Sequence, residues 1–117
     1  MNDTEYQVIV YSTPDGALPF RKWLDSLRDK ASQNIILRRI ERLRLGLFGD
    51  AKTLAGCNGL QELRINFGPG YRVYFAKVGS KLILLIGGGD KSSQDSDIRK
   101  AKIHLLEYRK KHDTFTS

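Results

Sequence analysis

The stretch ELRINFGPGYRVYF, residues 62–75, contains two short segments in which apolar and polar residues alternate. Alternation with a period of two is typical of strands that bury one face. A glycine-proline-glycine turn at 68–70 separates the two segments. We therefore predict an antiparallel hairpin whose apolar face joins the core and whose other face carries Arg64 and Arg72.

The apolar positions also set the register of this hairpin, because a slip of one residue would move every side chain to the wrong face. When the apolar faces are aligned across the turn, Ile65 pairs with Val73 and Arg64 pairs with Tyr74. Arg64 and Arg72 are then diagonal neighbours on one face of the sheet.

A further antiparallel strand is predicted after this hairpin. Gly79 and Ser80 have the character of a two-residue turn, with glycine first. The run LILLI at 82–86 is apolar on both faces, which is typical of a central strand. This turn places Arg72 opposite Gly87 and brings Lys91 to the face that carries the arginines.

The first half of the chain predicts one strand and two helices. YQVIVY at 6–11 is β-branched and aromatic, as strands are. Apolar residues at helical spacing predict one helix that begins at Pro19 and another over 31–45, and Trp23 is expected to pack in the core. The glycine-rich stretch 46–59 is predicted to be a loop, and a helix behind serine caps is predicted to end near 111.

Together these elements predict a single α+β domain over residues 1–117. We expect a four-stranded, mainly antiparallel sheet with two N-terminal helices on one face and a C-terminal helix. A chain of 117 residues with 40% hydrophobic and 28% charged residues has the size and composition of one globular domain.

Composition also limits the function. No window is apolar enough to span a membrane and the start does not resemble a signal peptide, so we expect a cytoplasmic protein with no membrane partner. One cysteine and two histidines predict neither a metal site nor a cofactor. The excess of 20 Lys and Arg over 13 Asp and Glu, a net charge of +7, suggests an anionic partner such as RNA, DNA or an acidic protein.

The predicted sheet gathers Arg64, Arg72 and Lys91 on one face. Like charges at close range repel one another unless an anion compensates them. A bound phosphate is one such anion, and the carboxylates of Glu62 and Asp90 are the alternative. The spacing of the residues leaves both interpretations open.

At this point the sequence resembles a known family. The order of strand, two helices, ELRINFGPGYRVYF, ILLIGGGDKSSQDSDIRKA and a closing helix is similar to the RelE/ParE toxin superfamily, in particular its HigB-like "addiction module killer" branch. The resemblance covers about 6–109. It implies the toxin of a type II toxin–antitoxin system, a metal-independent and translation-dependent mRNA endoribonuclease that leaves 2′,3′-cyclic phosphate and 5′-hydroxyl ends.

The resemblance also implies partners and roles for single residues. The partners are mRNA on the ribosome and a cognate antitoxin, a HigA-like helix-turn-helix protein. A ParE-like inhibitor of DNA gyrase, with no chemistry of its own, is the alternative function. Arg64, Arg72 and Lys91 match the catalytic cations of this family, and Lys52, Tyr74 and Gln94 are candidate RNA-binding side chains. The chemistry of the residues leaves three candidates for the general base: Glu62, Asp90, or a lysine whose pKa is lowered by its cationic neighbours.

Overall fold

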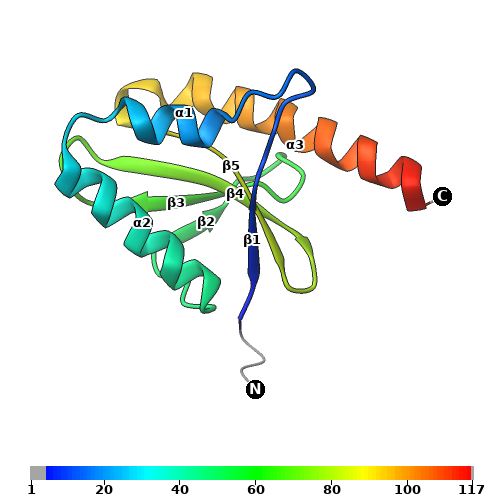
Figure 1. Cartoon of the computed structure of the whole chain (residues 1–117), viewed down its shortest axis with the longest axis horizontal. Coiled ribbons are helices and arrows are strands. Elements are labelled where there is room, and N and C mark those ends of the chain that lie inside the picture. The colour runs from blue at the N-terminus through cyan, green and yellow to red at the C-terminus, as the bar shows by residue number, and fades with distance from the viewer. Residues whose placement is uncertain (1–4, 117) are drawn as a thin grey trace.

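A computed structural model describes residues 5–116 of the chain, with side chains described up to 112. Figure 1 shows a twisted sheet with helices on both of its sides. None of the helices in the described part combines the length and the apolar character that a bilayer crossing needs. The elements, in chain order, are β1 (Gln7–Val10), α1 (Pro19–Ser26), α2 (Lys30–Arg44), β2 (Ala51–Thr53), β3 (Gln61–Ile65), β4 (Tyr71–Gly79), β5 (Leu82–Asp90), the 3₁₀ turn η1 (Lys91–Ser93) and α3 (Gln94–Thr116).

The sheet has five strands in the order β1-β5-β4-β3-β2, and β1 runs parallel to β5. The predicted four-stranded, mainly antiparallel sheet with two N-terminal helices on one face and a C-terminal helix is therefore wrong. The additional strand, β2, lies in the stretch predicted to be a loop. Three residues are too few to show an alternating pattern, and pairing with the edge of β3 is what makes this segment a strand.

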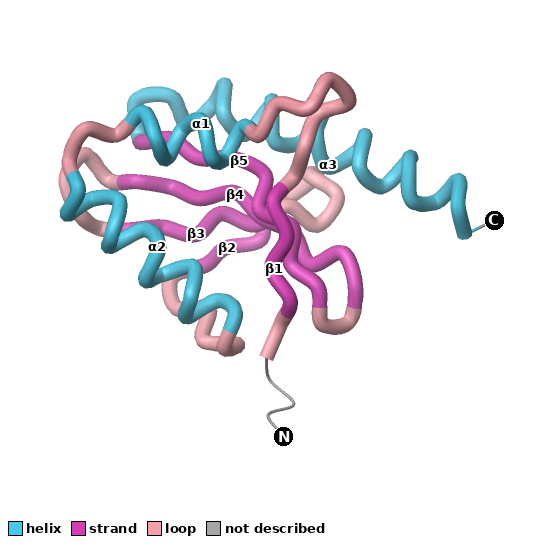
Figure 2. The backbone as a smooth tube through the Cα atoms, viewed as in Figure 1, coloured by secondary structure: helices cyan, strands magenta, loops and turns pink. Residues whose placement is uncertain are grey.

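Each face of the sheet has its own apolar cluster. Under α1 and α2 the cluster includes Leu24 and Ile36 from the helices and Val73 from β4. Under α3 the cluster joins Leu105 to Leu84 of β5. Figure 2 shows the consequence, which is that α2 and α3 lie on opposite sides of the sheet. The alternating residues of β5 are buried from both directions, as predicted for a central strand.

The hairpin of β3 and β4 has a longer loop than the sequence predicted. Ile65 pairs with Tyr71 and Arg64 pairs directly with Arg72, so the predicted register is wrong by two residues. The loop closes through a hydrogen bond from the Gly70 N–H to the Phe67 carbonyl, and Gly70 has φ 84°, a left-handed conformation that favours glycine. A shift of two residues preserves the face of each side chain, so Arg64 and Arg72 still share one face.

The register between β4 and β5 changes at a bulge. Phe75 pairs with Leu85 but Tyr74 pairs with Gly87, which leaves Ile86 as the extra residue. The predicted pairing of Arg72 with Gly87 is wrong, since Arg72 lies opposite Gly89. A bulge reverses the alternation of the strand that carries it. It places Gly87 and Gly89 opposite Tyr74 and Arg72 on the polar face of β4, and Gly88 opposite Val73 on the other face.

Gly88 is a site of close approach between a strand and a helix, whereas its neighbour Gly87 is open, and the two together give a test of the packing. A Cβ atom on Gly88 would lie 2.2 Å from Cε3 of Trp23, whereas a Cβ atom on Gly87 would meet no atom within 4 Å. We expect Gly88→Ala to lower the free energy of unfolding by about 1–3 kcal/mol through overpacking. Gly87→Ala is the matched control and should change it by less than about 1 kcal/mol. Urea unfolding of both variants measures the difference, and equal costs would contradict the packing of Trp23 on β5.

Candidate functional site

The candidate site is built on the polar face of β3 and β4. Arg64 and Arg72 occupy directly opposite positions on the two strands. They lie on the face away from α1 and α2, because their neighbours Leu63 and Val73 belong to the cluster beneath those helices. The Arg64 side chain is 38% exposed, and that of Arg72 is 12% exposed. The pair is therefore reachable from solvent mainly through Arg64.

One buried carboxylate lies between the two arginines. Glu62 is 1% exposed, and its two oxygens lie 3.4 Å from Nε of Arg64 and 3.6 Å from Nε of Arg72. The first contact is a long hydrogen bond, whereas the second is an ion pair without one. Glu62 offsets part of the repulsion between two guanidinium groups and leaves a net charge of +1 on the three side chains.

Two neutral side chains complete the surroundings of Glu62. The Tyr74 hydroxyl donates to Oε2 of Glu62 at 3.2 Å, and the Gln94 amide donates to the same oxygen at 2.8 Å. Burial, followed by the charge of Glu62 and this hydrogen bond, raises the pKa of Tyr74, so its hydroxyl remains a donor. Gln94 is the first residue of α3 and so fixes the start of that helix against the sheet.

Lys91 and Lys52 lie at the border of this site. The Lys91 side chain passes close to Gly70, since a Cβ atom on that glycine would lie 3.1 Å from Cε of Lys91. The carbonyl of Gly70 also accepts a hydrogen bond from Nη1 of Arg72 at 3.3 Å, so Lys91 and Arg72 are neighbours. Lys52 of β2 pairs with Glu62 and is exposed on the same face of the sheet.

The two predicted bases differ in what surrounds them. Glu62 is covered by the donors described above. Oδ1 of Asp90 accepts hydrogen bonds from the backbone N–H of Ser92 at 2.8 Å and from its hydroxyl at 2.6 Å. These bonds, above all the one from the hydroxyl, lower the pKa of Asp90. Asp90 therefore serves as the cap of η1 and is a weak base in this conformation.

The structure also brings Asp97 to the site, a residue to which we had assigned no role. Its Oδ2 accepts a hydrogen bond from the Ser93 hydroxyl at 2.5 Å and lies directly over Gly89, where a Cβ atom would be 1.8 Å away. Gly89 pairs with Arg72, which places Asp97 beside the arginine pair. The glycine run 87–89 is the signal in the sequence, because it permits a helix to approach the strand so closely.

Metal ligands do not cluster at this site. Within the described part of the chain, no group of three or more His, Cys, Asp or Glu side chains is arranged to hold a metal ion. The chemistry that the site offers is that of fixed positive charges: two guanidinium groups oriented by one carboxylate, with two lysines at the border. Such a group of cations is suited to binding a phosphate.

These features define an α+β protein with a candidate anion site on the open part of its sheet. No family model matches the chain. It is 45% identical over 90 residues to a protein of Haemophilus influenzae (strain ATCC 51907 / DSM 11121 / KW20 / Rd) described as an uncharacterized protein, and the match covers 77% of this chain and 89% of that protein. The chain belongs to the same family as this Haemophilus protein. The resemblance to RelE/ParE toxins stays a prediction.

Proposed function

We propose that the chain is the toxin of a type II toxin–antitoxin system and acts as a metal-independent mRNA endoribonuclease. The observation that carries this proposal is the pairing of Arg64 and Arg72 side by side on one face, oriented by the buried carboxylate of Glu62. The resemblance to HigB-like toxins supports it, as does the net charge of +7, which suits an RNA substrate.

The proposed reaction uses the nucleophile that RNA itself carries. The 2′-hydroxyl loses its proton to a solvent water as its oxygen attacks the adjacent phosphate, and the bond to the 5′-oxygen of the next nucleotide breaks as that oxygen takes up a proton. Arg72 and Arg64 bind the phosphate oxygens and stabilise the negative charge that develops on them, while Lys91 neutralises the leaving oxygen. The products are a 2′,3′-cyclic phosphate and a 5′-hydroxyl, with no metal ion required.

In this proposal Glu62 is a positioning residue and the cations carry the catalysis. Glu62 is too buried to touch the substrate, and it holds both guanidinium groups by their Nε atoms. The Nη atoms of a guanidinium anchored through Nε remain available to a planar anion. Lys52 at the border would bind the RNA backbone beyond the reacting phosphate. We place the activity in the cytoplasm, on translated mRNA, under the control of a helix-turn-helix antitoxin.

Expression of the chain tests this proposal. We expect the protein alone to arrest growth, co-expression of the adjacent gene to relieve the arrest, and primer extension to reveal new 5′ ends within coding regions. Transcripts that stay intact while gyrase-dependent DNA breaks accumulate would replace the ribonuclease with the ParE-like gyrase inhibitor. Normal growth with abundant folded protein would contradict a toxin of either kind.

A further inference from the structure

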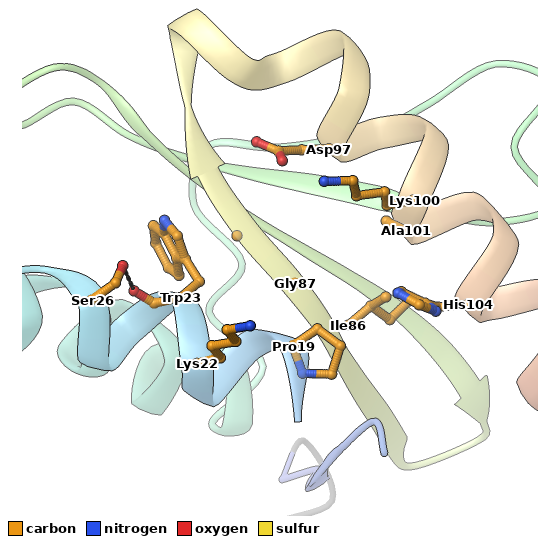
Figure 3. A pocket seen from close by; sticks show the side chains of 11 residues that line it. Pro19, Lys22, Trp23, Ser26, Ile86, Gly87, Asp97, Lys100, Ala101 and His104 are labelled. Carbon is orange, nitrogen blue, oxygen red and sulfur yellow. Dashed lines mark hydrogen bonds between the residues drawn. The ribbon is translucent and has the colours of Figure 1, made fainter. Parts of the chain in front are cut away.

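A second feature of the fold is a cavity between α1, β5 and α3, shown in Figure 3. Its volume is about 330 Å³, at the lower end of the range of small-molecule sites. Trp23 of α1 forms one wall, Gly87 and Gly88 of β5 form the floor, and Ala101 of α3 lies on the other side. The cavity has no part in the arrangement of the arginines, and no pattern in the sequence predicts it.

The floor of the cavity is an open strand edge. β1 pairs with β5 only over residues 82–85, and the last hydrogen bond between these segments runs from the Tyr11 N–H to the Leu85 carbonyl. Beyond Leu85, β5 therefore has its strand partner on one side only among the described residues. Backbone N–H and C=O groups on an unpaired edge alternate along the strand and are available to a ligand. Gly87 and Gly88 add no side chains that would cover them.

Trp23 presents an aromatic surface to this edge. Its ring packs against the backbone of Gly88 and lies edge-on to Tyr71, with ring centroids 6.1 Å apart. Trp23 packs against the cluster beneath α1 and α2, as predicted, and remains partly exposed. In Figure 3 it stands between α1 and β5 at the side of the cavity. A fixed and partly open indole is a stacking surface for a planar ring.

The charges around the cavity favour an anion beside such a ring. Lys22 of α1 and Lys100 of α3 reach it from opposite sides, and no described carboxylate forms an ion pair with either lysine. Asp97 contributes one negative charge. Burial lowers the pKa of His104, so this residue is neutral near pH 7, and its Nδ1 is a buried atom without a hydrogen-bond partner among the described residues. The lining carries a net charge of +1.

The cavity adjoins the arginine pair. Asp97 lines the cavity and also lies over Gly89, the residue opposite Arg72. Gly88 and Gly87 lie one and two residues before Gly89 on the same strand, and consecutive residues of a strand advance by about 3.3 Å. Trp23 lies on the α1 side of β5 and Arg72 lies on the face away from α1, so the cavity is a second site that shares Asp97 with the surroundings of the arginine pair.

We propose that this cavity binds one nucleotide of single-stranded RNA, with the base stacked on Trp23 and its polar edge on the open backbone of β5. Lys22 and Lys100 bind the phosphate of that nucleotide. The proposal rests on the proposed ribonuclease function, since it takes a nucleotide of the same RNA as the occupant of this second site. Single-stranded RNA is commonly recognised by this combination of aromatic stacking and polar contacts to the base edge.

Trp23 is the single tryptophan of the chain, so its fluorescence reports on the cavity directly. We expect saturable quenching by at least one of AMP, GMP, CMP and UMP, and none by ribose 5-phosphate. Lys100→Gln should weaken the binding about tenfold. Lys102→Gln, on the same helix but outside the cavity, is the matched control. Ala101→Leu should abolish the quenching by filling the cavity, with circular dichroism to verify its fold.

Two outcomes would overturn the proposal: no saturable quenching up to about 5 mM nucleotide, or quenching that Lys100→Gln and Lys102→Gln leave equally strong. Quenching by ribose 5-phosphate would reduce the cavity to a simple anion site. Arg72→Ala separates this proposal from the ribonuclease function, because it should stop cleavage and leave mononucleotide quenching unchanged. If the protein binds mononucleotides but cuts no RNA, the ribonuclease proposal is wrong and the nucleotide cavity stands. If it cuts RNA but binds no mononucleotide, the ribonuclease proposal stands and the nucleotide cavity is wrong.

Discussion

Arg72→Ala should reduce mRNA cleavage by about 100-fold or more, the usual cost of losing one preorganised charged donor. Arg72 is central in the proposed mechanism because its backbone pairs with both Arg64 and Gly89 and its side chain contacts Glu62. The fold should survive, since the residue contributes little to either apolar cluster. Primer extension on transcripts from induced cells measures the loss, and growth recovery should accompany it.

Two controls separate a specific role from a loss of positive charge. Arg38→Ala removes an exposed arginine from α2, on the other side of the sheet, and should leave cleavage within a few-fold of the original. Arg72→Lys keeps the charge but loses the planar pair of donors that binds phosphate oxygens in two places, so it should remain strongly impaired. If Arg38→Ala and Arg72→Ala reduced cleavage equally, the arginine pair would be no more than part of a basic surface.

The sequence predicts which face of the sheet each residue of the β3–β4 hairpin occupies, but it does not predict which residues lie opposite each other across the two strands. Alternation fixes which side of the sheet Arg64 and Arg72 occupy, and this prediction was confirmed although the register was wrong. The reason is that an error of two residues preserves the face, since the side-chain period of a strand is two. The length of the loop from Asn66 to Gly70 depends on its backbone conformation. The hydrophobic pattern does not predict that conformation.

The remaining errors arose where side-chain pattern is absent. The bulge at Ile86 comes just before three glycines, which have no side chains to show an alternation. The parallel pairing of β1 with β5 joins segments that are far apart in the chain and that no turn connects. The sequence also left open whether Glu62 or a ligand compensates the arginines. The contact from Tyr74 follows from its pairing with Glu62 across β3 and β4, whereas the contact from Gln94 depends on the placement of α3.

Glu62→Gln should lower the free energy of unfolding by about 2–4 kcal/mol. The substitution keeps the size of the side chain but removes the charge that Arg64 and Arg72 share, and it leaves Nε of the 12%-exposed Arg72 side chain without a counter-ion. An amide also turns a donor toward one of these guanidinium groups, where the carboxylate had offered only acceptors. Urea unfolding of the purified protein measures the change. Added sulfate should recover part of the loss, because an anion can bind the guanidinium group of Arg64, whose side chain is 38% exposed.

Glu41→Gln provides the matched control for this substitution. Glu41 also pairs with an arginine, and its Oε1 lies 2.6 Å from Nη2 of Arg44, but its side chain is 56% exposed. Water screens and replaces such a surface pair, so its loss should cost less than about 1 kcal/mol. The Glu41–Arg44 pair is shorter than either contact of Glu62, yet we expect it to contribute less to the free energy of unfolding. Glu62 is buried and compensates two arginines, and these two factors outweigh the difference in distance. If the two substitutions cost the same, Glu62 would not be the anchor that orients the arginines, and the geometry on which the proposed ribonuclease site depends would have to be assigned to other contacts.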